Sequence, residues 1–344
     1  MLSATVNRQA QGEPIFIVGS GRSGTSVLTW CLGQHPNILP VPETHWIARL
    51  TINLHKLYEI GSIHGRFSHL GALDWKEADF YAAFGRTVDQ FIVDTREPRL
   101  RFIQKSSLQK LGLTEREINE KMKTGEETFT SPTSNKNMQV VRNASDPKLR
   151  WVDGTPENVF YIYSLSLLFP GARFIHLLRD PNEVARSLMN FSQAGSAGAN
   201  HDEAKAYEHW LKHVEYAVKG EKALGKDKVL RIDYAEFIKS PESTLRSCFS
   251  FLGEEYNADC LLPLKERINS SKIDEPVSSF NPKSRESKRA NDYYQLILNQ
   301  PPGDPDQDEL QSLQQHFENL QNKSILHELY GILKKVILKT KNVI

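Results

Sequence analysis

The stretch from Ile15 to Leu28 reads IFIVGSGRSGTSVL and decides the fold of this chain. It consists of an apolar run typical of a buried strand, a glycine-rich turn and the start of a helix. In such a unit the backbone N–H groups of the turn and of the new helix point at one bound anion. The stretch therefore predicts a phosphate-binding strand, loop and helix within an α/β domain.

The loop differs from an ordinary nucleotide-triphosphate loop at one position. The spacing from Gly19 to Gly24 is that of a Walker A motif, but Thr25 stands where the lysine should follow. Without that lysine the loop has no point charge for the terminal phosphates of a triphosphate with magnesium. We expect it to hold a single phosphate group with Arg22 as the cation, although ordinary turn chemistry would also explain an isolated glycine-rich turn.

A second motif lies far downstream. Ala172 to Leu178 predicts another buried strand, which runs into Arg179-Asp180-Pro181. Asp and Pro suit the N-cap and the first position of a helix, so this triplet could be purely structural. Two helical turns on, the Ser187 hydroxyl would approach the Arg179 guanidinium, and the pair could bind a second phosphate. Together the two motifs indicate a nucleotide with two separate phosphates.

These motifs resemble those of sulfotransferases that use 3′-phosphoadenosine 5′-phosphosulfate (PAPS). The resemblance covers residues 13–50 and 150–255 and is nearest to the tyrosylprotein and bacterial type. It rests on Gly19 to Ser26, on Arg179 with Ser187, and on Arg231 to Tyr234 followed by Pro241-Glu242 and Phe251-Leu252-Gly253. It implies a PAPS-dependent enzyme with adenosine 3′,5′-bisphosphate (PAP) as product, a hydroxyl-bearing acceptor and no metal.

The resemblance also implies roles for individual residues. The 5′-phosphosulfate would lie on the loop, and the 3′-phosphate on Arg179 and Ser187. Tyr234, Ser271 and Lys272 would add nucleotide contacts, although a solvated loop explains the last two equally well. The loop residues concerned are Gly21, Arg22, Ser23, Gly24, Thr25 and Ser26.

Glu43 is the position at which the resemblance places the general base. From Arg22 up to this residue the sequence follows the family pattern without a gap. A carboxylate near the cofactor can take the proton that the acceptor hydroxyl loses as the sulfur is attacked. Glu43 could instead cap a helix that begins near Thr44 or pair with Arg49. His45 is the alternative base, because other sulfotransferases use histidine.

Gly154 departs from the family pattern. Many relatives have a lysine here, which helps to neutralise the bridging oxygen as it leaves. Its role would fall on Arg22, on Lys105 or on backbone donors, and Gly154→Lys is expected to be neutral or mildly activating. The departure supports a non-catalytic nucleotide-binding protein as an alternative. A small-molecule kinase is a weaker alternative, since Thr25 occupies the position at which kinases have the Walker lysine.

The length and composition allow one large α/β core or two modest domains. The chain has 344 residues, 39% of them hydrophobic, and a net charge of +1, which calls for no nucleic-acid partner. Cys31, Cys248 and Cys260 lie in apolar surroundings, which predicts reduced, buried thiols. His209 and His213 are one helical turn apart but have no third ligand, so we expect no metal.

The first residues lack the apolar core of a signal peptide, and nowhere do about 18 apolar residues follow one another. We therefore expect a cytoplasmic protein without a membrane span. A truncated luminal domain is the alternative, because animal relatives of this type carry an N-terminal anchor. The sequence is compatible with a homo-oligomer of this chain.

The expected fold is a P-loop-like three-layer α/β domain with a mostly parallel central sheet and extra helices. Strands are predicted at about 15–19, 172–178 and 228–232, with the ligand at their carboxyl ends. Residues 13–50 and 150–255 would form the nucleotide-binding core of a single domain, 1–344. Residues 51–149 would be a helical insert with a mobile loop on the substrate side, and 256–344 a cofactor-covering segment with C-terminal helices. Helices are predicted at Trp75 to Phe84, Thr87 to Thr95, Pro156 to Phe169, His201 to Lys219, Pro241 to Leu252, Asp308 to Leu320 and Ser324 to Lys339.

Overall fold

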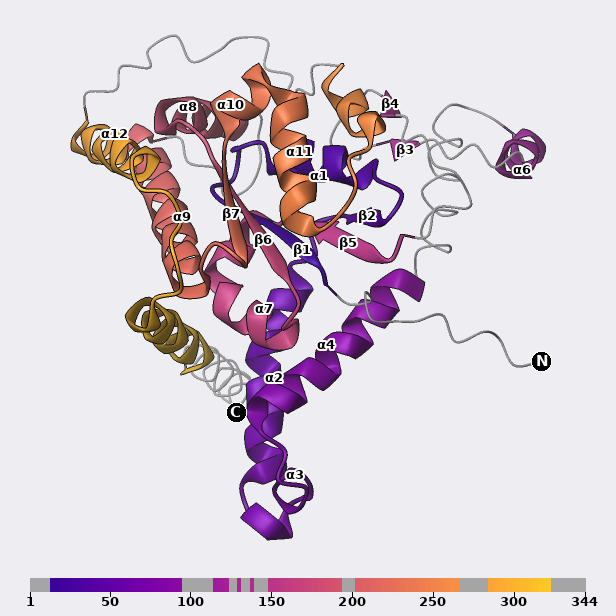
Figure 1. Cartoon of the computed structure of the whole chain (residues 1–344), viewed down its shortest axis with the longest axis vertical. Helices are drawn as coiled ribbons and strands as arrows, with labels where there is room; N and C mark the ends of the chain where they lie inside the picture. The colour runs from indigo at the N-terminus through magenta and orange to yellow at the C-terminus, as the bar shows by residue number, and fades with distance from the viewer. Residues whose placement is uncertain are drawn as a thin grey trace, which may run out of the picture.

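A parallel sheet of five strands forms the centre of the computed structural model (Figure 1). The structure describes residues 13–94, 114–123, 129–130, 137–138, 148–193, 202–265 and 284–322. The strand order is β2-β5-β1-β6-β7, and every pair of neighbours is parallel. The strands are β1 (Ile15–Val18), β2 (Ile38–Val41), β5 (Arg150–Asp153), β6 (Arg173–Leu178) and β7 (Val229–Asp233). This confirms the predicted α/β class and its parallel sheet.

The central strand β1 is apolar at every position because helices cover both faces of the sheet. Ile15 and Ile17 point into one hydrophobic cluster, whereas Phe16 and Val18 point into another, and all four are fully buried. This alternation divides the core into two halves, one on each side of the sheet.

One helical layer packs on the Ile15 and Ile17 face. Leu28, Phe237 and Phe249 come from three of its helices and join the same cluster. This helical layer consists of α1 (Thr25–Gly33), α10 (Tyr234–Lys239), α11 (Pro241–Leu252) and the 3-10 segment η4 (Ala258–Leu264). Gly253 ends α11 with a φ angle of 71°, a left-handed conformation that glycine commonly adopts at the C-terminus of a helix.

The second layer covers the Phe16 and Val18 face and continues beyond the sheet. It contains η3 (Pro156–Tyr161), α7 (Ile162–Leu168), α8 (Pro181–Gln193), α9 (Glu203–Leu224) and α12 (Arg285–Leu298), together with helical residues 307–322. Helices α8, α9 and α12 share a cluster of their own around Trp210 and Tyr294.

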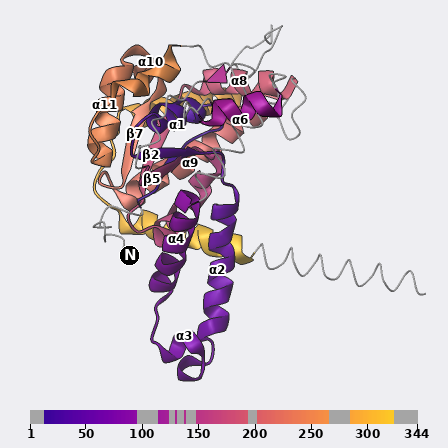
Figure 2. The same ribbon diagram turned by 90° about the vertical axis from the view of Figure 1, so that its right-hand side faces the viewer.

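An arm of two long helices projects away from the sheet, as Figures 1 and 2 both show. It comprises α2 (Trp46–Ser62), η2 (Gly65–Phe67), α3 (His69–Ala72) and α4 (Glu77–Asp94). Three short elements also lie in the predicted insert: α6 (Glu115–Lys123) and the paired strands β3 (Phe129–Thr130) and β4 (Asn137–Met138).

Two strands of the sheet, β2 and β5, were absent from the sequence prediction. β2 contains Pro40, and an edge strand tolerates a residue without a backbone donor. β5 begins with Arg150 and ends with Asp153, so it does not read as the continuous apolar run of a parallel strand. Both side chains are nevertheless buried, and each makes hydrogen bonds to distant segments: Arg150 donates to the carbonyl oxygens of Glu13 and Leu252, and Asp153 accepts from the Thr44 hydroxyl.

The prediction of two helices around 75–84 and 87–95 is wrong, because α4 runs unbroken from Glu77 to Asp94. Gly85 lies in its middle, where a Cβ would come within 1.7 Å of the Leu168 carbonyl oxygen. The glycine thus allows α4 to lie against the end of α7 rather than separating two helices. The helix predicted from Pro241 to Leu252 is confirmed at both ends, and those predicted from His201 and from Asp308 are confirmed with shifted ends. The segment predicted as one helix from Pro156 to Phe169 is a 3-10 segment followed by α7, and the helix predicted from Ser324 lies outside the described residues. No helix in the described ranges has the length and apolar composition needed to cross a membrane.

Candidate nucleotide-binding and catalytic site

The loop after β1 has the conformation of an anion cradle. Gly19, Arg22 and Gly24 have φ angles of 144°, 70° and 97°, and the Ser23 N–H donates to the Ser20 carbonyl at 3.1 Å. A Cβ on Gly19 would lie 2.7 Å from the Leu177 carbonyl oxygen of β6, so glycine is required there. Gly24 is the N-cap of α1, and the unpaired N–H groups at this helix start face the loop.

The loop hydroxyls differ in exposure. Thr25 begins α1 and is buried, whereas Ser26 is exposed. The Ser23 hydroxyl oxygen is buried, and within the described ranges it has no hydrogen-bond partner. A buried hydroxyl without a partner is uncommon in native proteins. Its place in a glycine-rich loop therefore fits an oxygen-rich ligand such as a phosphate.

Tyr234 connects this loop to the second predicted motif. A Cβ on Gly24 would lie 2.4 Å from the Tyr234 ring, so the ring packs directly on the loop glycine. The Arg179 guanidinium carbon lies 4.2 Å from the centroid of the same ring. Tyr234 is the first residue of α10, directly after β7, and the structure brings it together with both phosphate motifs as the resemblance implies.

Arg22, Arg179 and Ser187 lie in direct contact. Arg22 Nε donates to Ser187 Oγ at 3.1 Å, and Arg179 Nη1 donates to the Arg22 carbonyl at 3.1 Å. Burial and the positive charge of Arg179 lower the pKa of Arg22. Two guanidinium groups that are close enough to repel each other attract an anion, since a negative group relieves that repulsion.

Arg179 also contacts Glu183, one turn into α8, through a 2.8 Å ion pair. The Glu183 side chain is 54% exposed, and a solvent-exposed pair of this kind is weak. A phosphate would compete for the same guanidinium fork. Asp180 accepts from the N–H groups of Asn182 and Glu183, which confirms it as the N-cap of α8.

The sheet topology explains why the two motifs meet. β1 and β6 are parallel neighbours, so the loops after them leave the same edge of the sheet side by side. From β1 the chain passes to β2 and β5 on one side, while β6 and β7 lie on the other. Ligands of open α/β sheets bind at such a change of direction, beyond the carboxyl ends of the strands.

The Glu43 segment follows β2 and is held in place by Asp153 at the end of β5. The buried Asp153 carboxylate accepts from Thr44 Oγ1 at 2.5 Å, from Asn158 Nδ2 at 2.8 Å, and from the N–H and the hydroxyl of Thr155. Thr155 Oγ1 in turn accepts from the Thr44 N–H at 2.9 Å. The sequence analysis did not predict Asp153 as a site residue. It could have been found if Arg150 to Asp153 had been recognised as a strand that ends in a carboxylate.

Glu43 itself pairs with His45, whose Nε2 lies 3.1 Å from Glu43 Oε2. On the other side of the same ring, His45 Nδ1 lies 3.7 Å from Glu157 Oε2. Partial burial raises the pKa of Glu43, His45 opposes that shift, and the carboxylate of Glu157 adds to it. The alternative of a helix beginning near Thr44 and capped by Glu43 is wrong, since α2 begins at Trp46 with His45 at its N-cap.

The expectation that Gly154→Lys is neutral conflicts with the packing at this position. A Cβ on Gly154 would lie 2.4 Å from Thr29 Oγ1, which donates to the Thr25 carbonyl at 2.9 Å. Any side chain here must displace Thr29 and break that bond in the first turns of α1. Lys105, Ser271 and Lys272 lie outside the described residues.

His209 and His213 lie on α9 with their ring centroids 4.0 Å apart. His213 Nδ1 bonds to the His209 carbonyl oxygen, and His209 Nε2 lies 3.4 Å from the place of a Cβ on Gly21. The pair therefore packs behind the loop. The described part of the chain holds no group of three or more histidine, cysteine or acidic residues able to bind a metal. Cys31, Cys248 and Cys260 are buried free thiols, as predicted.

Comparison with known proteins finds one curated relative and several solved structures that are similar to this chain. A curated, uncharacterised protein of Aquifex aeolicus is 22% identical over 273 residues, which is 74% of this chain and 26% of that protein. The chain thus spans about a quarter of the length of this relative. Among solved structures, the sulfotransferase domain of an olefin synthase from Synechococcus is 18% identical, with 91% of this chain and 98% of that one covered and a TM-score of 0.41. A sulfotransferase from Mycobacterium avium is also 18% identical, with 91% and 77% covered and a TM-score of 0.37.

The sequence profile described as the sulfotransferase family matches residues 14–258. This range includes the loop after β1, the Glu43 segment, the Arg179 motif and Tyr234, and it takes in all five strands of the sheet. The chain therefore belongs to the sulfotransferase family.

Proposed function

We propose that this enzyme transfers a sulfuryl group from PAPS to an acceptor hydroxyl by in-line displacement. The observation that carries the proposal is the contact of Arg22, Arg179 and Ser187 over a glycine loop without a Walker lysine. Two guanidinium groups suit two separate phosphate groups, whereas a triphosphate with magnesium calls for the lysine. The Ser23 hydroxyl, which has no hydrogen-bond partner among the described residues, fits the same ligand.

Each group would then have a defined task. PAPS supplies an activated sulfuryl group on a bridging oxygen. Residues from Ser23 to Ser26 would bind the 5′-phosphate, Arg179 and Ser187 the 3′-phosphate, and Arg22 would stabilise charge at the sulfuryl group. The acceptor oxygen forms the new bond to sulfur, the bond to the bridging oxygen breaks with its electron pair on PAP, and Glu43 takes the acceptor proton.

A non-catalytic nucleotide-binding protein is the second candidate. The close packing of Gly154 on Thr29 favours it, because the lysine of many relatives has no room there. Both candidates bind PAP, and only the enzyme turns over PAPS. Transfer of labelled sulfuryl groups to a panel of phenols, sugars, lipids and peptides decides between them.

Calorimetry with PAP, AMP and ATP with magnesium tests the nucleotide site. We expect PAP to bind more tightly than AMP, and Arg179→Ala to weaken PAP by about 2–4 kcal/mol, because a charged donor to the phosphate is lost. Equal affinity for PAP and AMP in the parent protein would contradict the 3′-phosphate assignment.

Arg246→Ala is a closely matched control for this measurement. Arg246 also pairs with a glutamate four residues earlier in its helix, Glu242, and its guanidinium carbon lies 3.9 Å from the Tyr256 ring centroid. It therefore repeats the ion pair and the ring contact of Arg179 away from the loop. PAP affinity should be unchanged in this variant.

A further inference from the structure

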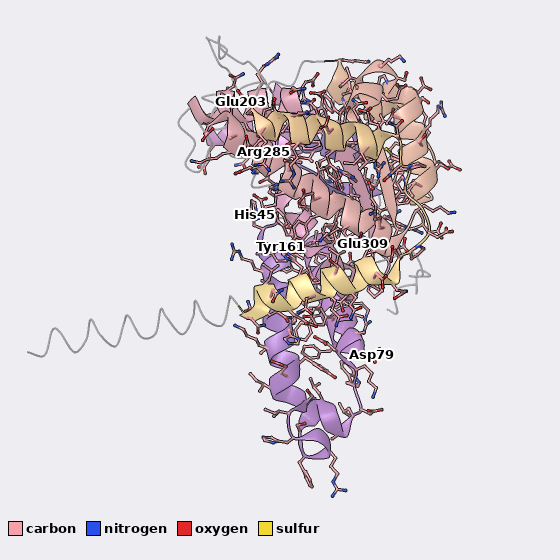
Figure 3. All side chains as sticks on the ribbon, turned by 90° about the vertical axis from the view of Figure 1, so that its left-hand side faces the viewer. His45, Asp79, Tyr161, Glu203, Arg285 and Glu309 are labelled. Atoms are coloured by element: carbon pink, nitrogen blue, oxygen red, sulfur yellow. The ribbon has the colours of Figure 1, made fainter. Side chains whose placement is uncertain are left out.

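The far end of the arm, residues 60–72, is an exposed turn with several large apolar side chains, and we call it the arm tip. Ile60, Ile63 and Phe67 are 69%, 70% and 82% exposed there. Figure 3 shows the arm continuing past Asp79 to this end, away from His45 on the body of the molecule. Single exposed apolar residues are ordinary, but three on one projecting turn form a patch that suggests an interaction surface.

The backbone of the turn is held by its own contacts. Gly65 has a φ angle of 51°, and its carbonyl oxygen accepts from the N–H and the hydroxyl of Ser68 at 2.9 and 2.7 Å. Leu70 of α3 is buried against α2, where a Cβ on Gly61 would lie 2.6 Å from Leu70 Cδ1. Because Leu70 already fills the inside of the turn, Phe67 stays on the outside in contact with water.

The arm tip combines this apolar surface with positive charge. Its sequence contains neither aspartate nor glutamate. Its basic residues are His64, Arg66 and His69. The nearest acidic residues on either side have basic neighbours: Glu59 lies 3.4 Å from His55, one turn back along α2. Asp74 pairs with Lys76 at 2.7 Å. A negatively charged partner therefore meets no unpaired carboxylate from the tip itself.

Arg66 and Phe67 are arranged as a cation beside an aromatic ring. The guanidinium carbon of Arg66 lies 4.9 Å from the centroid of the Phe67 ring. At the surface of a bilayer, an apolar ring enters the boundary between headgroups and acyl chains, while a neighbouring cation binds lipid phosphate. An exposed apolar turn with an arginine and no acidic residue has the chemistry that such a surface requires.

We propose that the arm tip docks on the surface of an anionic lipid bilayer. Ile63 and Phe67 enter the boundary of the acyl chains, and Arg66 binds the headgroup phosphates. The helix α2 spans about 25 Å between His45 and the tip, so docking leaves the proposed catalytic site open. The inference goes beyond sulfuryl transfer, because docking needs neither PAPS nor PAP.

A second copy of the chain suits the arm tip less well. Three side chains of about 100–200 Å² each fall short of the roughly 800 Å² that each partner buries in a stable protein interface. Two tips would also bring like charges together, which opposes their association. A lipid surface needs no matching area, since each apolar side chain enters it independently.

Sedimentation of the full chain with lipid vesicles tests the apolar contact. We expect binding to phosphatidylcholine vesicles that contain about 30% phosphatidylglycerol, and weaker binding to phosphatidylcholine alone. Ile63→Ser and Phe67→Ser should each weaken binding by about tenfold, because each removes an inserted apolar side chain. Ile238→Ser is the matched control, since Ile238 is 51% exposed on α10 of the body, and its binding should equal that of the parent protein.

The charge is tested by Arg66→Gln. Binding to the anionic vesicles should fall by about fivefold, the contribution of one arginine near a negative lipid surface. Arg116→Gln is the matched control, because Arg116 is 90% exposed on α6, and this variant should bind as the parent protein does. Circular dichroism should be the same for all of these variants, since the changed side chains already lie in water.

Tryptophan fluorescence reports insertion directly. Vesicles with brominated acyl chains should quench the emission of Phe67→Trp more strongly than that of the parent protein, whereas Ile238→Trp should show no added quenching. Equal binding of the parent protein to neutral and anionic vesicles, absence of binding, or no added quenching in Phe67→Trp would overturn the inference. Self-association of the parent protein that Phe67→Ser abolishes, without vesicle binding, would also overturn it and assign the arm tip to a second copy of the chain.

Discussion

At the scale of single residues, Glu43 and Arg22 are held by quite different means. Glu43 lies half-exposed on a segment that Asp153 fixes through Thr44, and its own side chain contacts only His45 among the hydrogen bonds of the described chain. Arg22 sits in the loop with a positive φ of 70° and reaches across to Ser187. Placement of Glu43, the proposed base, thus depends on β5, and placement of Arg22 depends on β6 and α8.

The first prediction concerns Glu43→Gln. PAP affinity should stay within about threefold while kcat falls by roughly 10²–10⁴, the usual contribution of a positioned base. Partial burial raises the pKa of Glu43 above its ordinary 4.5, so the ionised base is lost as the pH falls through that raised value. The pH profile of kcat/KM for the parent enzyme should show an acid limb above pH 4.5 that the variant lacks. Retained turnover here, with loss in His45→Ala, would give the role to His45.

The second prediction concerns Arg22→Lys. An ammonium cannot reproduce the planar fork that donates to Ser187 while facing the ligand, so we expect kcat/KM to fall by at least about 10²-fold. Lys239→Arg is a control on an exposed side chain of α10 and should be neutral. Intact turnover in Arg22→Lys would mean that another cation stabilises the sulfuryl group.

At the scale of elements, the contact between β5 and α1 explains the departure at position 154. The backbone after β5 runs so close to α1 that Gly154 leaves no room for a Cβ beside Thr29. The sequence motif shows that a lysine is missing, but it does not show that the space is filled. That information comes from two elements that are far apart in the chain.

The third prediction concerns this contact. Gly154→Ala should lower the free energy of unfolding by about 1–3 kcal/mol, because it overpacks the site and breaks the bond from Thr29 to the Thr25 carbonyl. Thr29→Ala removes the obstructing oxygen, so the double variant should lose less than the sum of the two single ones. Urea denaturation of the parent protein, the two single variants and the double variant measures these changes in the free energy of unfolding. A loss in the double variant equal to the sum of the two single losses would contradict the prediction.

At the scale of the whole molecule, a buried ionic group ties the C-terminal part of the chain to the sheet. Glu221 of α9 accepts from Arg231 of β7 and lies 2.6 Å from His176 Nδ1 of β6. Arg231 Nη1 also donates to the carbonyl oxygens of Ile297 and Gln300 at the end of α12. Glu221 thus links α9 to two strands, and Arg231 extends this link to the end of α12.

The fourth prediction concerns Glu221→Gln. Losing one partner of a buried ion pair costs about 3–5 kcal/mol, since Arg231 keeps its charge. Burial acts to raise the pKa of Glu221, but His176 and Arg231 hold it below its ordinary 4.5. The stabilisation is therefore complete above pH 4.5 and is lost as the pH falls through the lowered value. Unfolding in urea across this range should depend less on pH in the variant.

Glu242→Gln is the control for that measurement. Glu242 pairs with Arg246 but is 54% exposed, so its removal should cost no more than about 1 kcal/mol. An equal loss in both variants would show that burial of the Glu221 pair does not matter for stability.

The features of this protein that depend on neighbouring residues could be predicted from the sequence. Two strand-loop-helix units could be predicted at Ile15 and Ala172, together with the Asp180 N-cap, the Gly253 helix end and the three buried thiols. Each follows from local backbone preferences or from the apolar character of a short run, which act within a few residues.

Which of these segments contact one another became known from the three-dimensional fold. The Arg22 to Ser187 bond joins residues 165 apart, and the Thr44 to Asp153 bond joins residues 109 apart. β2 and β5 became recognisable once the sheet supplied parallel neighbours for strands whose own sequences contain proline, arginine and aspartate. The rings of Trp46 and Phe91 meet because the arm returns α4 to the start of α2. Such contacts depend on long-range pairing between segments, and no local pattern encodes that pairing.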